Sequence, residues 1–430
     1  MSRIENPREA IKDDSTGIFC LSIMCQYGLL TFFLFIHNYF LNLKINKGWE
    51  QHKLENVFTK YQKRINPTQQ NLELWSLTID QGLVAKTKRY DRSFLVRKND
   101  IFNLVPKGYF VYNPMNITLG TIDVNKYHSI AVSGYYIVLK SNDQFNVAFL
   151  ASLLHTSSMI NKYKRFSTGS LLEKQRLQFP NFAKVKIISP RLSEQTKIGL
   201  LMNQVNNLID LQQRKLEQLK QLKIFTLQRM FIDKDCKQPI LRFKNFKDNW
   251  LPHKFNDIAN TFSGGTPAIS NKDYYGGNIP FIRSAEINKN TTQLHLTPDG
   301  LKNSSAKFIK KGTLLYALYG ATSGEVGIAQ IDGAINQAVM AITLKKDNVY
   351  FIKTWLIKNK RKIISTYLQG GQGNLSAKIV KHLKLSLPKI EEEKLISITI
   401  MKIDSLIKLQ QSKIDDLVNL KKYLLQKLFI

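Results

Sequence analysis

Two glycine-rich stretches in this sequence combine small residues with hydroxyl and amide side chains. The first is Ser263-Gly264-Gly265-Thr266-Pro267, and the second is Gln369-Gly370-Gly371-Gln372-Gly373-Asn374. Because glycine adds no bulk, backbone N–H groups in such stretches can approach a phosphate, while Gln and Asn side chains can hydrogen-bond adenine through both amide atoms. Either stretch alone is more typical of an ordinary turn, so its surroundings decide between a turn and a binding site.

Basic, aromatic and hydroxyl side chains that suit the same chemistry occur elsewhere in the chain. Arginine is the natural reader of guanine, and Arg283 with Ser284 ends a predicted strand. Residues 163–170 interleave these types in the run Tyr-Lys-Arg-Phe-Ser-Thr-Gly-Ser. The candidate DNA-binding residues are therefore Lys63, Arg64, Lys88, Arg89, Tyr163, Lys164, Arg165, Ser167, Gly169, Ser263, Gly264, Gly265, Thr266, Arg283, Ser284, Tyr319, Thr322, Gln369, Gly371, Gln372 and Asn374.

Residues that could catalyse a reaction are scarce by comparison. The seven histidines show no HExxH or HxH spacing, the three cysteines form no CxxC pair, and no GxxxxGK[ST] loop occurs. Residues 112–115 are similar to the Asn-Pro-Pro-aromatic motif of adenine methyltransferases, but Met115 replaces the second proline and the aromatic residue is missing. Glu392-Glu393-Lys394 matches the E-x-K of many nucleases, yet it falls in the first turn of a predicted helix. We therefore expect no catalytic residue and no metal site in this chain.

The charge distribution shows where a polyanion could bind. The 430 residues include 63 Lys and Arg against 32 Asp and Glu, a net charge of +31, and 43% are hydrophobic, which excludes a wholly disordered chain. Residues 48–188 hold 20 basic residues against 9 acidic ones, and residues 234–387 hold 23 against 9. Two separate basic segments suit a nucleic-acid duplex held at two places, or an anionic membrane surface. The alternative is a basic surface that only keeps the protein soluble.

The chain contains an internal repeat. Residues 190–232 align without gaps on residues 388–430, at a constant offset of 198. A second match opens each half, because Gly48-Trp49-Glu50-Gln51-His52-Lys53-Leu54 is similar to Asn249-Trp250-Leu251-Pro252-His253-Lys254-Phe255. The identical pairs of the first match include Pro190 and Pro388, Glu194 and Glu392, Leu208 and Leu406, and Leu219 and Leu417. The protein therefore consists of two copies of one plan, a globular segment followed by a long helix.

Apolar residues in the two aligned segments recur every three to four residues, which predicts long helices. Each helix of about 40 residues would be ~60 Å long. Gln212 with Lys215, and Gln410 with Lys413, interrupt the apolar stripes and would fix the register of a coiled coil. The stripes consist of Leu201, Val205, Leu208, Leu219 and Leu222, and of Ile403, Leu406, Leu417 and Leu420. The alternative is a pair of unrelated amphipathic helices in two cores, which fits the narrow stripes less well.

The segments before the two helices are expected to have an α/β fold. Runs of β-branched and aromatic residues between Pro, Gly and Asn predict strands at 100–105, 109–112, 135–139, 313–318 and 338–344. Helices are predicted at 147–163 and 349–367. The chain is thereby divided into an apolar extension (1–47), a first globular domain (48–188), a first helix (189–233), a second globular domain (234–387) and a second helix (388–430).

These features together resemble the specificity (S) subunit of type I restriction-modification systems. The stretches that carry the resemblance are 241–250 (which begins Leu-Arg-Phe), 262–267, 274–283, 320–328 and 370–376 in the second half, and 109–115 and 133–136 in the first. The resemblance covers residues 48–430 and includes the repeat. It implies two α/β target recognition domains, each followed by a long helix, with the helices paired as an antiparallel coiled coil and the halves related by a pseudo-twofold repeat.

The resemblance also implies what this chain binds. Each recognition domain would read one half of a bipartite sequence in double-stranded DNA, and the helices would dock two methyltransferase (M) subunits, which restriction (R) subunits join. S-adenosylmethionine, ATP and Mg are expected on those partners, and no cofactor is expected in this chain. A non-catalytic, cytoplasmic protein is expected, and three cysteines without a disulfide pattern suit a reducing compartment. The alternative is a stand-alone nucleic-acid enzyme such as a nuclease.

The N-terminal segment differs in composition from the rest of the chain. Residues 15–43 contain no Asp, Glu, Lys or Arg, and residues 18–41 are nearly all apolar, which is the length of a transmembrane helix. Asp13 and Asp14 precede the stretch, and no small-residue cleavage site typical of a signal peptide follows it. We interpret residues 1–47 as an extension outside the repeat, from a wrong start or a disrupted leader. A membrane anchor on a basic protein is the alternative.

Overall fold

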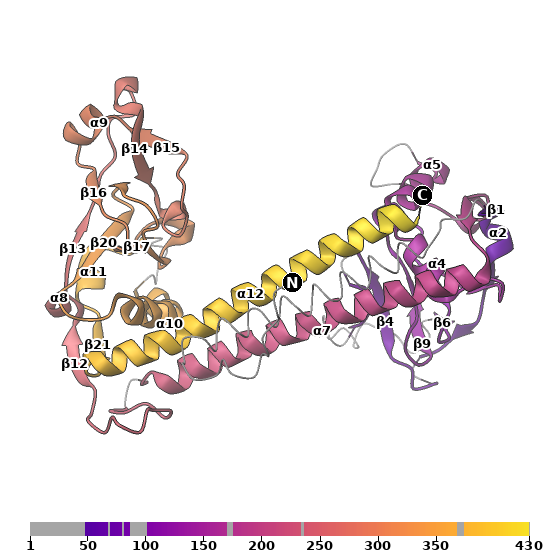
Figure 1. Cartoon of the computed structure of the whole chain (residues 1–430), viewed down its shortest axis with the longest axis horizontal. Coiled ribbons are helices and arrows are strands. Elements are labelled where there is room, and N and C mark those ends of the chain that lie inside the picture. Colours follow the sequence, from indigo (N-terminus) through magenta and orange to yellow (C-terminus); the bar gives the residue numbers. More distant parts are fainter. Residues whose placement is uncertain are drawn as a thin grey trace, which may run out of the picture. The chain divides into compact units, whose positions relative to one another are not determined.

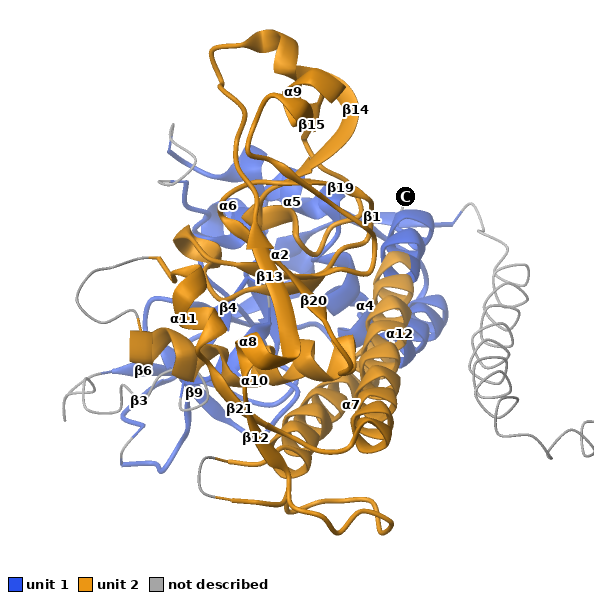
Figure 2. Cartoon of the chain, turned by 90° about the vertical axis from the view of Figure 1, so that its left-hand side faces the viewer, with its two compact units in different colours: residues 1–206, 420–430 blue, residues 207–419 orange. Residues whose placement is uncertain are grey.

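The computed structural model describes residues 48–67, 69–79, 81–86, 101–169, 175–233, 236–367 and 374–429. The chain forms two compact units (Figures 1 and 2). Unit 1 comprises residues 1–206 and 420–430, and unit 2 comprises residues 207–419. The C-terminal residues thus belong to the unit that contains the first globular segment.

The described part of unit 1 is built on small sheets with short helices beside them. The strands are ordered β1-β11, β2-β10-β7-β8 and β3-β6-β9-β4-β5, and all neighbours are antiparallel except β4 and β9. The elements are β1 (Glu50–Lys53), α2 (Leu54–Val57), β2 (Phe58–Tyr61), β3 (Arg64–Ile65), β4 (Leu74–Thr78), β5 (Gly82–Ala85), β6 (Phe102–Val105), β7 (Phe110–Tyr112), η2 (Ile117–Leu119), β8 (Ile122–Val124), β9 (Ile130–Ser133), β10 (Ile137–Ser141), α4 (Val147–Leu153), α5 (Ser157–Phe166), α6 (Phe179–Ala183) and β11 (Lys186–Ser189).

Unit 2 repeats this plan. Its strands are ordered β12-β21, β13-β20-β17-β18 and β15-β14-β19-β16, and β14 and β19 form its parallel pair. The elements are β12 (Leu251–Lys254), α8 (Phe255–Ile258), β13 (Ala259–Ser263), η4 (Lys272–Tyr274), β14 (Tyr275–Ile282), η5 (Ser284–Glu286), β15 (Leu294–Leu296), α9 (Pro298–Lys302), β16 (Lys307–Ile309), β17 (Leu314–Ala317), η6 (Gly320–Thr322), β18 (Val326–Ile328), β19 (Gly333–Ile335), β20 (Val339–Leu344), α10 (Val349–Tyr367), α11 (Ala377–Lys381) and β21 (Lys384–Leu387).

The four-stranded sheets β2-β10-β7-β8 and β13-β20-β17-β18 are equivalent, which confirms the predicted α/β fold and its repeat. β17 is buried at all four positions, and so are the first four residues of β20, because both of their faces lie inside the core. A continuous apolar run is the pattern expected of a strand buried on both faces. Together with α8, α10 and the ends of the long helices, these strands form the main core of unit 2.

The predicted strands and the helix at 349–367 agree with the structure, but the helix predicted at 147–163 is two helices. α4 ends at Leu153 and α5 begins at Ser157. Thr156 separates them, because its side chain accepts a hydrogen bond from the Met159 N–H and its hydroxyl donates to the Leu153 carbonyl. A threonine in this role starts a new helix, and the hydrophobic period across the break does not reveal it.

The two long helices, α7 (Leu192–Met230) and α12 (Ile390–Leu428), agree with the predicted spans (Figure 1). Leu222 and Leu406 were expected in the apolar stripes, but both are about half exposed. The buried residues of each helix instead form a row in which they recur every three to four residues. Each row continues through the polar middle of the helix, so it includes Gln212 in α7 and Gln410 in α12. Those rows are Leu201, Val205, Ile209, Gln212 and Leu216 in α7, and Gln410, Ile414, Leu417, Leu420 and Leu424 in α12.

Within unit 2, α7 and α12 contact each other through polar groups. The Gln410 Nε2 donates to both the carbonyl and the Oε1 of Gln212, each at 2.9 Å, and all of these groups are buried. Eleven residues further along α7, Lys223 forms an ion pair with Asp404 at 2.6 Å. The partner residue on α12 moves backward as α7 moves forward, so these segments run antiparallel. Gln212 and Gln410 are repeat mates, and a buried hydrogen bond between mates sets one register.

Each long helix ends in an aromatic cluster of the same design. In unit 2, Phe231, just after α7, lies 4.9 Å from Phe351 and 6.3 Å from Trp250, measured between ring centroids. In unit 1, Phe429, just after α12, lies 5.3 Å from Phe149, whose ring is 6.3 Å from that of Trp49. The repeat in the sequence is therefore also a repeat in packing.

The start of each long helix is joined to its globular segment through an asparagine. This asparagine caps the N-terminus of a helix of that segment, α4 in unit 1 and α10 in unit 2. In unit 1, the Asn146 N–H donates to Gln195 Oε1 at 2.9 Å, and Gln195 Nε2 donates to the Pro190 carbonyl at 2.8 Å. In unit 2, the Asn348 N–H donates to Glu393 Oε2 at 2.7 Å. Glu393 is fully buried, and its repeat mate in unit 1 is the neutral amide Gln195. Burial, together with the neighbouring Asp347, raises the pKa of Glu393 to about 8, although the Asn348 hydrogen bond lowers it.

The free energy of unfolding is therefore expected to depend on pH through Glu393. Because the folded-state pKa lies above the ordinary value of 4.5, the folded protein keeps a proton that the unfolded chain has lost between these values. Stability should fall, by on the order of 4 kcal/mol, as the pH rises from about 5 to about 8. Urea denaturation of the full chain measures this, and Glu393→Gln, which copies Gln195, should remove the dependence. An equally steep dependence in that variant would contradict the assignment.

No helix among the described residues is long and apolar enough to cross a membrane. The apolar stretch at 18–41 lies outside the described residues.

Candidate DNA interface

Three segments of unit 2 leave the sheet β13-β20-β17-β18 at the same edge. Ser263, the last residue of β13, pairs with Met340, and Ala317, the last residue of β17, pairs with Val339. The ends of β13 and β17 and the start of β20 therefore meet. We call the adjoining segments, residues 264–267, 318–323 and 335–338 with Asn374, the unit 2 loop edge. It brings together Thr266, Tyr319, Thr322 and Asn374, which are distant in the sequence.

Backbone hydrogen bonds hold these segments to one another. The Leu318 N–H donates to the Ala338 carbonyl, and the Leu375 N–H donates to the Leu318 carbonyl, both at 2.8 Å. Tyr319 and Asn374 form an antiparallel bridge. The loop edge is therefore fixed by the sheet rather than by its own exposed side chains, so it can carry different residues without a change of fold.

Close packing explains the two glycines of the Ser263–Pro267 stretch. A Cβ on Gly264 would lie 1.8 Å from the Ile335 carbonyl oxygen, and one on Gly265 would lie 1.8 Å from the Ser305 Oγ. Neither neighbour can move that far, because the first is backbone and Gly265 also meets the Ser305 backbone at 2.9 Å. The glycines bring two chain segments together, and the predicted approach to phosphate is not needed to account for them.

Arg283 has partners inside the protein. Its guanidinium contacts both carboxylate oxygens of Glu286, at 3.2 and 3.3 Å, and the Gln293 Oε1 at 2.9 Å. Burial would raise the pKa of Glu286, but the hydrogen bonds from Arg283 and the Gln293 backbone hold it below its ordinary value. Ser284, the first residue of η5, is half-buried beside this ion pair. Arg283 thus neutralises a buried carboxylate, and its contact with guanine stays a prediction.

Unit 1 presents an equivalent edge. Tyr61 at the end of β2 pairs with Val138, and Tyr112 at the end of β7 pairs with Ile137 at the start of β10. The adjoining segments, residues 62–64, 113–121 and 134–136, form the unit 1 loop edge. The Leu177 N–H closes it by donating to the Pro114 carbonyl at 2.9 Å. Its exposed residues include the predicted contacts Lys63 and Arg64.

The prediction that Tyr163 contacts DNA is wrong. Its side chain is fully buried, and its hydroxyl donates to the Leu154 carbonyl at 3.1 Å. Tyr163 follows Met159 by one helical turn on the buried face of α5, and the basic residues after it misled the interpretation. Lys164 and Arg165 are exposed at the end of that helix, whereas the Ser167 hydroxyl donates to the Tyr163 carbonyl.

Of the remaining candidates, Gly169 is described by the structure, and five others lie outside the described residues. Gly169 is exposed with a φ of 111°, a conformation that favours glycine. It directly precedes a stretch outside the described residues. The other candidates outside the described residues are Lys88, Arg89, Gln369, Gly371 and Gln372.

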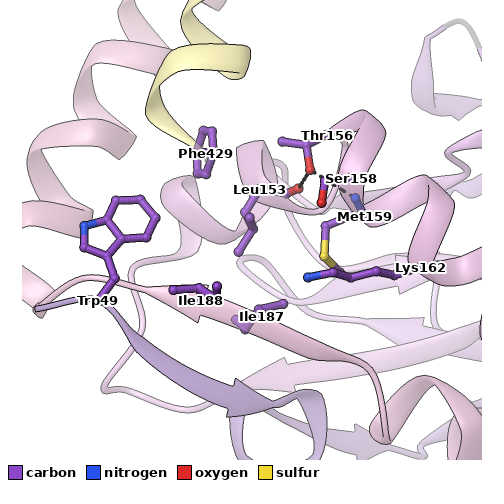
Figure 3. Close-up of a pocket in the computed structure, with 9 residues that line it drawn as sticks. All are labelled: Trp49, Leu153, Thr156, Ser158, Met159, Lys162, Ile187, Ile188 and Phe429. Atoms are coloured by element: carbon purple, nitrogen blue, oxygen red, sulfur yellow. Dashed lines mark hydrogen bonds between the residues drawn. The ribbon is translucent and has the colours of Figure 1, made fainter. Parts of the chain in front are cut away.

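A small pocket in unit 1 is lined by residues of α4, α5 and β11, with Trp49 and Phe429 (Figure 3). Its volume of about 20 Å³ has room for roughly one water molecule. The Lys162 ammonium at its rim donates to the Lys186 carbonyl at 2.8 Å. The pocket is therefore too small for a nucleotide or S-adenosylmethionine, and it is lined by Trp49, Leu153, Thr156, Ser158, Met159, Lys162, Ile187, Ile188 and Phe429. Among the described residues, no cluster of His, Cys, Asp and Glu could hold a metal ion.

Two exposed residues of the loop edges were not among the predicted contacts. Gln337 precedes β20 in unit 2, and Tyr135 takes the equivalent place before β10 in unit 1. The available signal was a polar or aromatic residue directly before a predicted strand. Its meaning depends on strand order, because only the pairing of β20 with β13 brings Gln337 beside the glycine-rich stretch.

This repeated fold, with one loop edge in each copy, has a known family. Residues 46–221 and residues 247–419 both match the family model described as the type I restriction modification DNA specificity domain. The two matches span most of the chain, and the chain therefore belongs to this family.

Individual relatives agree with the family. The chain is 27% identical over 167 residues to the MjaIX specificity subunit, and 25% identical over 235 residues to the MjaX specificity subunit, type I restriction enzyme subunits of Methanocaldococcus jannaschii. These alignments span 36% and 51% of this chain, and only 38% and 52% of those proteins. The fold is similar to that of a type I restriction-modification S subunit from M. genitalium, with a TM-score of 0.61, 14% identity and coverage of 90% of this chain and 98% of that one.

Proposed function

We propose that this chain is the DNA sequence-specificity subunit of a type I restriction-modification complex and reads a bipartite target in double-stranded DNA. The observation that carries the proposal is the loop edge found twice, once on each copy of the four-stranded sheet. Each edge lies in one of the two strongly basic segments of the sequence. Loops on a rigid sheet, in segments with a large net positive charge, suit base contacts supported by phosphate contacts.

The chemistry of the complex belongs to other subunits in this proposal. Two methyltransferase subunits bind S-adenosylmethionine, and restriction subunits use ATP and Mg, while this chain directs them as a non-catalytic cytoplasmic component. Exposed apolar residues along the long helices, such as Leu200, Leu211 and Leu409, support docking of partner proteins there. The antiparallel contact between Gln212 and Gln410 supports a paired spacer that sets the gap between the half-sites.

The experiment is to map DNA methylation in the host with and without this gene. Methylation at one bipartite motif is expected to disappear without the gene and to return with it. Replacing residues 234–387 by the equivalent domain of another family member should change one half-site alone. A motif that persists without the gene, or purified chain that cleaves DNA with Mg and no partner, would refute the proposal.

A further inference from the structure

The contact between Thr266 and Gln337 joins two segments of the unit 2 loop edge through their side chains. The Thr266 hydroxyl donates to the Gln337 Oε1 at 2.6 Å, although 71 residues separate them in the sequence. Both residues are exposed. We infer that Gln337 is a specificity-determining residue of the second recognition domain and that Thr266 positions it. The inference rests on the proposed function and names the base chemistry that this edge reads.

Thr266 is held in place from both sides. Gly264 and Gly265 before it pack directly against Ile335 and Ser305, because a Cβ added to either glycine would lie 1.8 Å from its neighbour. Pro267 after it is buried, and the Tyr275 hydroxyl donates to the Pro267 carbonyl at 2.8 Å. A threonine between a close-packed glycine pair and an anchored proline keeps its hydroxyl in one place. The glycine-rich stretch therefore holds the Thr266 hydroxyl where it hydrogen-bonds the Gln337 side chain.

Gln337 lies at the tip of a tight turn. The Val339 N–H donates to the Asn336 carbonyl at 3.2 Å, which places Gln337 and Ala338 at the two central positions. The turn is tied to the end of β17 by the hydrogen bond from Leu318 to Ala338. Gln337 thus projects from a fixed backbone, with its amide oxygen already engaged.

The hydrogen bond to the Gln337 oxygen favours some bases over others as partners of the amide. A free glutamine pairs with adenine through its oxygen and its nitrogen together. The Thr266 hydroxyl occupies one of the two acceptor positions of Gln337 Oε1, so the Nε2 hydrogens are the groups of this amide best placed to face a ligand. Such a donor suits a base that presents acceptors in the major groove, guanine through O6 and N7 or thymine through O4, and does not suit the amino group of cytosine.

The equivalent positions of unit 1 carry different chemistry. Thr266 follows the last residue of β13 by three positions, and Arg64 follows the last residue of β2 by three. Gln337 and Tyr135 both stand two residues before the first residue of β20 or β10. A hydroxyl–amide pair in one copy and a guanidinium and a phenol in the other suit two domains with different half-sites.

The test compares variants of the full chain in complex with its partner methyltransferase subunits. Methylation mapping gives the motif, and binding to duplexes with each base substituted in turn gives the discrimination. Gln337→Ala should reduce discrimination at one position of one half-site by about 5- to 150-fold. Gln337→Glu should shift the preference there toward cytosine, whose amino group donates to a carboxylate.

Substitutions at Thr266 distinguish a positioning role from a purely structural one, because they should change base discrimination without changing the fold. Thr266→Val keeps the shape but removes the hydroxyl and should relax the same position as Gln337→Ala, whereas Thr266→Ser should restore discrimination. Gln330→Ala is the matched control, because Gln330 is exposed but adjoins the opposite ends of the strands, where Ala329 bonds Thr313.

The outcomes separate this inference from the proposed function. Unchanged discrimination in both Gln337→Ala and Thr266→Val overturns the inference, even if replacing the whole domain still changes one half-site. A domain replacement that changes neither half-site overturns the proposed function instead. If a Thr266 variant folds poorly, Gln337→Glu still tests the inference. A gain of cytosine preference supports it, and an unchanged preference contradicts it.

Discussion

The affinity of this protein for duplex DNA is expected to fall about a thousandfold or more between roughly 50 and 200 mM salt. The reason is counterion release: a protein that neutralises about six to ten phosphates loses roughly 10³ to 10⁵ in affinity over that range. Two basic segments, with 20 and 23 Lys and Arg against 9 acidic residues each, provide the charge for contacts of that number. Fluorescence anisotropy with a labelled duplex at several salt concentrations measures the slope.

Single substitutions locate the charges responsible. Lys63→Gln and Arg64→Gln, both on the unit 1 loop edge, should each lower the log–log slope by about one without changing the motif. Lys389→Gln is the control, because Lys389 is exposed but paired with Asp248 at 2.6 Å, just before α12. A flat slope in the unsubstituted protein would contradict a duplex held at two places.

Much of the fold could be predicted from hydrophobic patterns, because those patterns arise from burial. Residues 338–344 read as a buried strand and form one, and the repeat placed both long helices within two residues of their ends. Leu222 and Leu406 were assigned wrongly to the apolar stripes. Apolar residues alone defined the stripe, whereas the packed row passes through Gln212 and Gln410, whose burial depends on the hydrogen bond between them.

The candidate interface could be predicted only in part. Thr266, Tyr319 and Asn374 were found from residue type, but the sequence does not reveal that they share a sheet edge. That grouping depends on strand order, and β20 lies between β13 and β17 although it follows both in the chain. Tyr163 shows the opposite error, because its basic neighbours suggested a contact while its own helical face is buried.

Lengthening the spacer is expected to change the target in a defined way. Four residues inserted after Gln213, and four after its repeat mate Gln411, add about one turn, or ~5.4 Å, to each helix. Because one base pair advances the duplex by about 3.4 Å, the unspecified gap between the half-sites should grow by one or two base pairs. Both half-site sequences should stay the same, since no loop edge is altered. Methylation-site sequencing in a host with the partner subunits gives the readout.

Shorter insertions provide the matched control. Two residues at the same places rotate the following helix by about 200°, because an α-helix turns about 100° per residue, whereas four residues return it to within roughly 40°. The two-residue variant should therefore expose the rows that contain Leu216 and Ile414 and lose activity. An active four-residue variant with an unchanged gap would show that the helices do not set the spacing. A changed half-site would show that the helices themselves contact bases.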